Sequence, residues 1–148
     1  MMRESTKQGG MVAVEFAILL IPLVLIVFGI TELGRAFYQY NTLVKATRDA
    51  ARYKSATNQG AKEAEAKCLA VTGNDTCTGT PLVEGLTTNM VTISYAQSVP
   101  TCSGSVNLVG VTINDPNATE KFKFVSLVSF VIPDITFGPI STVMRSPT

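Results

Sequence analysis

An unbroken apolar stretch near the N-terminus constrains the fold of this chain more than any other feature. Residues Met11–Ile30 contain one charged side chain, Glu15, and are otherwise apolar apart from Pro22 and Gly29. Twenty residues in an α-helix rise about 30 Å, which matches the hydrocarbon core of a bilayer. The alternative is a buried core helix, but a domain this small could hardly cover such a helix on all sides. The stretch is therefore predicted to span a membrane.

The apolar stretch does not have the form of a secretory signal that is removed after export. The apolar part of such a signal is about 7–15 residues long and ends at a small-x-small cleavage site. Here the run is longer, and the sequence that follows it, TELGR at positions 31–35, forms no such site. The segment is predicted to stay in the mature protein.

Charge does not fix the orientation of the span, because basic residues lie on both sides: Arg3 and Lys7 before it, Arg35 and others after it. The N-terminus is placed in the cytoplasm because its tail is short and polar, and because the cysteine-bearing remainder resembles an exported domain. The predicted division is a leader at residues 1–10, a transmembrane segment at 11–30, an extension of the same helix at 31–56 and a distal domain at 57–148.

The helical pattern continues beyond the span. Apolar side chains recur at three- and four-residue steps, as one helix face requires; they are Leu33, Phe37, Tyr40, Val44 and Ala51. A second face carries Lys45, Arg48 and Arg52. One helix is predicted from about Met11 to Ala56. Its apolar face is expected to pack on the distal domain or on another subunit, and its basic face to be solvated surface or a contact surface.

The distal part is predicted to form a small α+β domain. Ala, Glu and Lys dominate Ala61–Val71, which indicates a second, shorter helix. Alternating apolar and polar residues predict strands at Val91–Tyr95, Val106–Asn114 and Lys121–Val128. Two or three antiparallel strands with a packing helix complete the expected fold class, α+β with a long N-terminal transmembrane helix.

The distal domain carries all three cysteines, Cys68, Cys77 and Cys102. In an oxidising compartment they allow one disulfide and one spare thiol, and the sequence does not choose among the three pairings. Zinc is a weak alternative, because the spacings are wide and histidine is absent. No metal site and no cofactor are expected.

The chain contains no histidine, which removes the commonest general base and the commonest metal ligand together. It also shows no phosphate-binding loop and no dinucleotide fingerprint. Its formal net charge is +1, which predicts no nucleic-acid partner. The sequence therefore predicts that the protein is not an enzyme.

A carboxylate inside the apolar stretch needs an explanation. Glu15 lies about one turn into the span, where a charge costs about 2.5–3.5 kcal/mol on insertion scales. It either reaches the membrane interface or pairs with a cation. Gly10, Met11, Glu15 and Phe16 together resemble the cleavage signal of the type IV pilin superfamily, in which a prepilin peptidase cuts after the glycine. The resemblance implies cleavage between Gly10 and Met11, and pairing of Glu15 with the new amine of a neighbouring subunit.

Within that superfamily, residues 9–56 look like the TadE-like minor pilins, or pseudopilins, of tight-adherence (Flp-type) pilus systems. The positions that match the family's recurring residues are Gly29, Glu32, Gly34, Arg35, Ala46, Arg48, Ala50, Ala51 and Arg52, and the tail STVMRSPT resembles the family's terminus. The resemblance implies a minor pilin that acts in pilus assembly, adhesion or secretion. Its partners would be the membrane, other pilins or pseudopilins, the assembly platform and a prepilin peptidase.

The same resemblance implies a single pass through a bacterial inner membrane, with a cytoplasmic N-terminus and a periplasmic distal domain. Incorporation into an extracellular pilus is a further option. The alternative function is an uncleaved, membrane-anchored module that presents its domain to a periplasmic partner.

Overall fold

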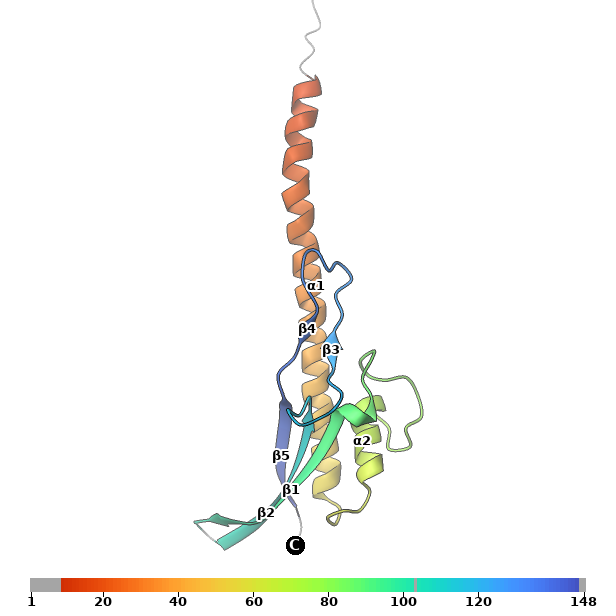
Figure 1. Cartoon of the computed structure of the whole chain (residues 1–148), viewed down its shortest axis with the longest axis vertical. Coiled ribbons are helices and arrows are strands. Elements are labelled where there is room, and N and C mark those ends of the chain that lie inside the picture. The colour runs from red at the N-terminus through yellow and green to blue at the C-terminus, as the bar shows by residue number, and fades with distance from the viewer. Residues whose placement is uncertain (1–8, 103, 147–148) are drawn as a thin grey trace, which may run out of the picture.

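A computed structural model describes residues 9–102 and 104–146 of the chain. Helix α1, Gly9–Ser55, has 47 residues and continues through Pro22, which makes it about 70 Å long. In Figure 1 its first half stands clear of the rest of the chain and its second half packs into a small head. The single helix predicted from about Met11 to Ala56 is confirmed. Of the predicted leader, only Gly9 and Gly10 lie within the described residues.

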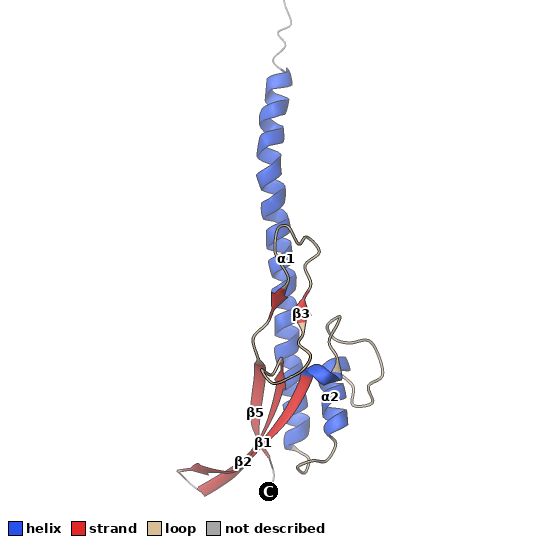
Figure 2. Cartoon of the chain, in the orientation of Figure 1, coloured by secondary structure: helices blue, strands red, loops and turns tan. Residues whose placement is uncertain are grey.

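The head has two layers. Helix α2, Glu63–Thr72, lies beside the second half of α1. The other layer is an antiparallel sheet in the order β1-β2-β5, formed by Val91–Thr101, Gly104–Ile113 and Ile140–Ser146 (Figure 2). A short 3₁₀ helix, Thr88–Met90, leads into β1. A second, two-stranded sheet pairs β3, Lys123–Phe124, with β4, Ile135–Thr136. The predicted fold class, α+β with a long apolar N-terminal helix, is confirmed.

The core lies between these two layers. Helix α1 contributes Leu43, Ala50 and Ala51, all fully buried. Alternate residues of β2, Val109, Val111 and Ile113, are fully buried because successive side chains of a strand point to opposite faces. The second half of α1 is thus a component of the head's core.

The third predicted strand is wrong in extent and in position. Of Lys121–Val128, only Lys123 and Phe124 pair as a strand. The alternation was real, since Phe122, Phe124 and Ser126 are buried, but these residues pack without joining the main sheet. The third strand of that sheet is β5, near the C-terminus, which the sequence did not predict.

The other predicted elements differ only in their ends. The strand predicted at Val91–Tyr95 extends to Thr101, with an irregularity in its pairing between Ala96 and Val99. The strand predicted at Val106–Asn114 runs from Gly104 to Ile113. The helix predicted at Ala61–Val71 begins and ends slightly later, at Glu63 and Thr72.

A disulfide joins Cys68 of α2 to Cys77 in the following loop, across a Cα–Cα distance of 4.7 Å. It is one of the three pairings that the sequence left open. Cys102 is an exposed free thiol next to the turn that joins β1 to β2. Gly73 caps the C-terminus of α2: it is left-handed, and its N–H bonds to the carbonyl of Leu69.

Candidate functional sites on the long helix

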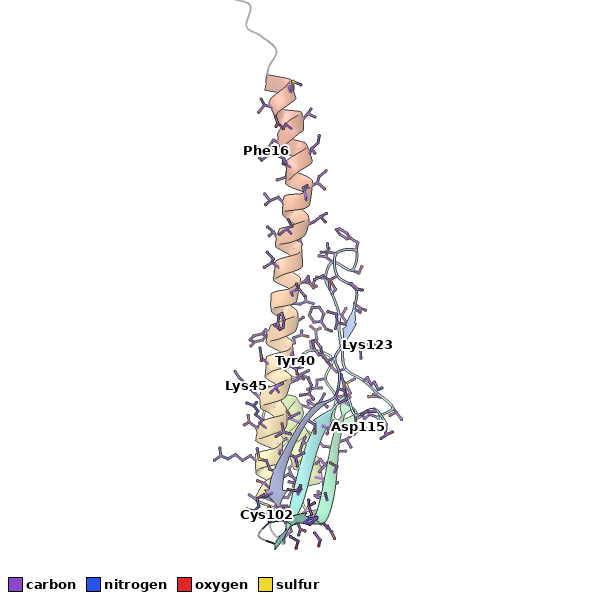
Figure 3. All side chains as sticks on the ribbon, turned by 90° about the vertical axis from the view of Figure 1, so that its left-hand side faces the viewer. Phe16, Tyr40, Lys45, Cys102, Asp115 and Lys123 are labelled. Atoms are coloured by element: carbon purple, nitrogen blue, oxygen red, sulfur yellow. A yellow bond between two sulfur atoms is a disulfide. The ribbon has the colours of Figure 1, made fainter. Side chains whose placement is uncertain are left out.

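The first half of α1 has the composition of a membrane span and no cover from the described part of the chain. It contains the one helix segment among residues 9–102 and 104–146 that is long and apolar enough to cross a bilayer, and none of this segment is buried. In Figure 3 its side chains, including Phe16, project all round the helix. A surface of this kind is stable in contact with lipid or with other apolar helices.

The predicted processing residues lie at the start of this segment. Gly10 and Met11 are in the first turn of α1, and Glu15 and Phe16 follow about one turn later, all exposed. Met11 and Glu15 are four residues apart and therefore lie on the same helix face. No ion pair to Glu15 is formed within the described residues.

A clamp around Glu32 and Arg35 joins α1 to the head just beyond the span. Glu32 is 3 % exposed. Its carboxylate accepts hydrogen bonds from the Ser126 hydroxyl and the Leu127 N–H, both at 3.2 Å. The Arg35 guanidinium lies 3.6 Å from the same carboxylate. A buried carboxylate is costly unless it is paired and hydrogen-bonded, and here it is both.

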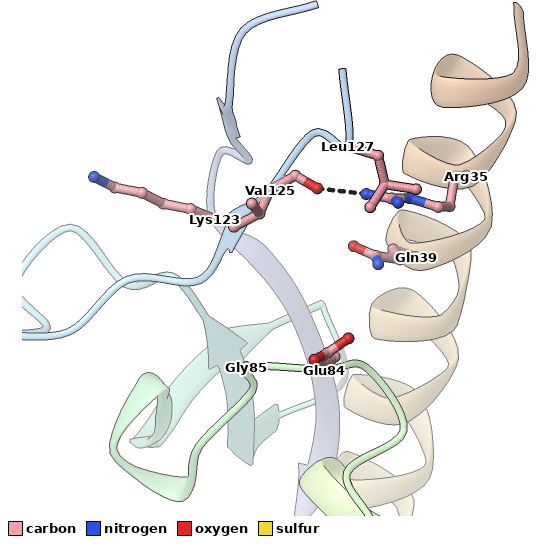
Figure 4. A pocket seen from close by; sticks show the side chains of 7 residues that line it. All are labelled: Arg35, Gln39, Glu84, Gly85, Lys123, Val125 and Leu127. Atoms are coloured by element: carbon pink, nitrogen blue, oxygen red, sulfur yellow. Dashed lines mark hydrogen bonds between the residues drawn. The ribbon is translucent and has the colours of Figure 1, made fainter. Parts of the chain in front are cut away.

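Arg35 also holds the segment that approaches the helix. Its guanidinium lies over the Phe124 ring, 4.8 Å from the centroid, and donates a hydrogen bond to the carbonyl of Val125 (Figure 4). Residues 125–134, which we call the β3–β4 loop, are thereby fixed against α1. The loop is also tied within itself, because the Ser126 N–H donates to Asp134 Oδ1 at 3.1 Å.

A cavity of about 520 Å³ opens beside this clamp, between α1, the Glu84–Gly85 turn and the end of β3. Figure 4 shows Arg35 and Gln39 at its helical wall, and the amino group of Lys123 directed away from that wall. Two buried polar atoms, Arg35 Nε and Gln39 Oε1, have no hydrogen-bond partner in the described part of the chain. The cavity therefore has a mixed lining, with polar groups of α1 on one side and the apolar residues Val125 and Leu127 beside them.

The apolar face of the extension divides into two parts. Ala51 is buried and Val44 partly buried against the core. Leu33, Phe37 and Tyr40 instead line an apolar groove of about 260 Å³ together with Ala36, Ile135 and Phe137. Tyr40 meets Phe137 edge to face at 5.6 Å, but Phe37 remains 66 % exposed. Packing on the chain's own domain therefore covers the part of this face at Val44 and Ala51 and leaves the part at Phe37 exposed.

The basic residues of the extension differ in burial: three are exposed and one is buried. Lys45, Arg48 and Arg52 are exposed, and Figure 3 shows Lys45 on the side of α1 away from the sheet. Lys54, which the sequence did not single out, is 1 % exposed. Its ammonium group donates to the carbonyls of Asn58 and Ala61 after the end of α1. A cation in the last helical turn was the available signal for such a cap.

The matched glycines show no tight contact in the single chain. A Cβ added to Gly34 would meet nothing within 4 Å, and one on Gly29 would meet Val131 Cγ1 at 3.7 Å. The other residues that match the TadE-like pattern separate into three groups. Glu32 and Arg35 form the clamp, three alanines are buried against the head, and the arginines at 48 and 52 face outward.

A single apolar helix that continues into a small α+β head is consistent with a single-pass membrane anchor. Residues 10–52 match the family model of TadE-like protein. The chain thus carries a TadE-like N-terminal region, as the sequence indicated, which supports a minor pilin associated with a tight-adherence pilus in general terms. No curated protein and no solved structure matches the chain.

Proposed function

We propose that the chain is a minor pilin, or pseudopilin, subunit of a tight-adherence pilus that acts in pilus assembly, adhesion or secretion rather than as an enzyme. The observation that carries the proposal is the TadE-like match over residues 10–52, which falls on a helix whose first half is apolar and uncovered. In this proposal α1 crosses the bacterial inner membrane once, with its N-terminus in the cytoplasm and its head in the periplasm.

The proposal includes cleavage by a prepilin peptidase between Gly10 and Met11. This peptide bond lies in the first turn of α1, and glycine is a poor helix former, so little helix is lost when the bond is exposed to a protease. Intact-mass measurement of the membrane-extracted protein, with and without the matching peptidase, tests the cut. The expected product begins at Met11.

Substitution separates a specific cut from general proteolysis. Gly10→Val is expected to abolish the product that begins at Met11, while Gly34→Ala, on the same helix but far from the signal, leaves it unchanged. A chain that stays uncut in cells that process related pilins would contradict the proposal and favour an uncleaved anchored module.

Assembly is proposed to proceed through the uncovered surfaces of α1. The apolar span supplies the surface that neighbouring pilin helices contact in the membrane. The groove lined by Leu33, Phe37 and Tyr40 extends that surface along α1 beyond the span. Other pilins and the assembly platform are the proposed partners.

A further inference from the structure

The β3–β4 loop reaches the membrane-spanning part of α1 although it belongs to the head. In Figure 1 it rises from β3 along α1 and turns back into β4. Its tip is a turn in which the N–H groups of Val131 and Ile132 bond to the carbonyl of Val128. A Cβ built on Gly29 would lie 3.7 Å from Val131 Cγ1, so the tip is level with the last turn of the predicted span.

The tip is apolar and directed outward. Residues 124–133 contain no charged side chain. Leu127 and Phe130 are each 79 % exposed, and Val125 is also exposed. Large apolar side chains exposed along one loop are unfavourable in water, and a surface of this kind marks a contact with another surface.

The base of the loop has the opposite character. Lys121 and Lys123 are exposed just before it, and Figure 4 shows the Lys123 side chain extending away from α1. Arg35 lies about 9 Å along the helix from Gly29, which is near the depth of the lipid headgroups when Gly29 is at the edge of the hydrocarbon. Apolar residues at the tip and cations at the base match the two layers of a bilayer surface.

We propose that the β3–β4 loop inserts its tip into the outer leaflet of the membrane that α1 spans, so that Phe130 contacts the acyl chains, while Leu127, which lies beside Arg35, contacts the headgroup region. The Glu32–Arg35 clamp holds the loop parallel to α1, so the head is attached to the membrane at two points and its tilt about the exit of α1 is restricted. The proposal requires α1 to span the membrane, but it requires neither cleavage nor pilus assembly.

Tryptophan fluorescence of the full chain in vesicles tests the insertion. The chain contains no tryptophan, so each variant carries one reporter. Phe130→Trp reports the tip, Leu20→Trp the middle of the span and Val143→Trp the exposed sheet of the head. The vesicles contain phosphatidylethanolamine, phosphatidylglycerol and a lipid brominated near the top of its acyl chains, with the protein kept dilute.

Bromolipid is expected to quench Phe130→Trp and to leave Val143→Trp unquenched, and the emission of Phe130→Trp is expected to lie to the blue of that of Val143→Trp. Bromine moved to the end of the acyl chains should quench Phe130→Trp less and Leu20→Trp more. Equal behaviour of Phe130→Trp and Val143→Trp would overturn the proposal. So would a blue shift that arises only at high protein density without bromine quenching, because the loop would then contact another subunit. An unquenched Leu20→Trp would remove the membrane-spanning premise and the proposal with it.

Discussion

Asn114 connects three separate backbone segments at the end of β2. It is buried and left-handed, with φ of 61°. Its amide nitrogen donates to the carbonyls of Phe122 and Phe137, both at 3.1 Å, and its amide oxygen accepts from the Phe122 N–H at 2.6 Å. Asparagine is one of the few residues that adopt a left-handed conformation at low cost. One residue therefore adopts the turn conformation and makes the hydrogen bonds that hold the turn.

Replacement of this residue should destabilise the head. Asn114→Ala removes three hydrogen bonds and leaves buried groups unpaired, at a cost of about 3 kcal/mol in the free energy of unfolding. Asn114→Gly avoids the strain of a left-handed alanine but does not restore the lost hydrogen bonds, so most of that cost should remain. Urea unfolding of the full chain in micelles measures both. Asn117→Ala, in the same turn, is the matched control. If Asn114→Gly proved as stable as wild type, the bonds would contribute little.

Tyr95 gives the head a pH dependence in the alkaline range. Its hydroxyl donates to Glu63 Oε1 at 2.7 Å. Burial, followed by this hydrogen bond to Glu63, raises the pKa of Tyr95 from 10.0 to about 12. The folded state therefore holds the proton more tightly than the unfolded state. The resulting stabilisation is complete below pH 10 and is lost as the pH rises through about 12.

Tyr95→Phe removes this titration. The melting temperature of wild type should exceed that of Tyr95→Phe below pH 10, and the difference should narrow between pH 10 and about pH 12. Thermal melts of both proteins across that range provide the measurement, and Tyr38→Phe, which removes an exposed hydroxyl, is the control. A difference that stays constant with pH would mean that the Tyr95 hydroxyl acts only through packing.

At the scale of elements, the Glu32 carboxylate couples the β3–β4 loop to α1. Glu32→Ala leaves the Ser126 hydroxyl and the Leu127 N–H without this acceptor, and a buried donor left unpaired costs about 1–3 kcal/mol. The loop is expected to detach before the head unfolds, so chymotrypsin should cut sooner near Phe130. Glu32→Gln, which keeps one acceptor oxygen, should fall between wild type and Glu32→Ala. Lys45→Ala should behave as wild type, and equal cutting rates in all four proteins would contradict the coupling.

Local patterns determine which elements were predictable. Helix α1 and strands β1 and β2 carry the period of their own structure, helix α2 has a helix-forming composition, and all four were predicted. The segment at Lys121–Val128 carries the period of a strand, yet most of its contacts lie outside any sheet. The Phe122 backbone bonds to Asn114, and Ser126 and Leu127 donate to Glu32. Strand β5 has few apolar residues and gains its place by pairing with β2. Neither the packing of this segment nor the pairing of β5 can be predicted from local sequence.

The clamp was only partly predictable for the same reason. Glu32 and Arg35 were singled out by their resemblance to the family pattern, and their three-residue spacing allows a pair on one helix face. Their contacts with residues 124–127 join positions about ninety residues apart in the chain, and sequence periodicity carries no information on such contacts. Lys54 was missed because an isolated lysine in a helix is more often on the surface.

At the scale of the whole molecule, Glu15 is the one charged residue of the apolar segment, and it has no ion-pair partner among residues 9–102 and 104–146. The described part of the head offers Glu15 no contact, because its contacts with α1 lie at Gly29 and beyond (Figure 1). Cleavage after Gly10 would create an amine at Met11, at nearly the same depth in the membrane. Pairing of that amine with Glu15 of a neighbouring subunit would remove two poorly solvated charges and align the two helices along their axes.

Glu15→Ala tests whether this pairing drives assembly. Membrane insertion should become easier, because a group that costs about 2.5–3.5 kcal/mol in the bilayer is lost. Cleavage should persist, because Gly10 is unchanged, so the intact mass of the membrane-bound product serves as an internal check. Crosslinking and co-purification with the other pilus components should be lost. Glu15→Gln, which keeps the size but not the charge, should fail in the same way, while Glu65→Ala in the head should associate normally. If Glu15→Ala is inserted, cut and associated as wild type is, Glu15 is an interfacial residue and subunits are aligned by apolar contacts alone.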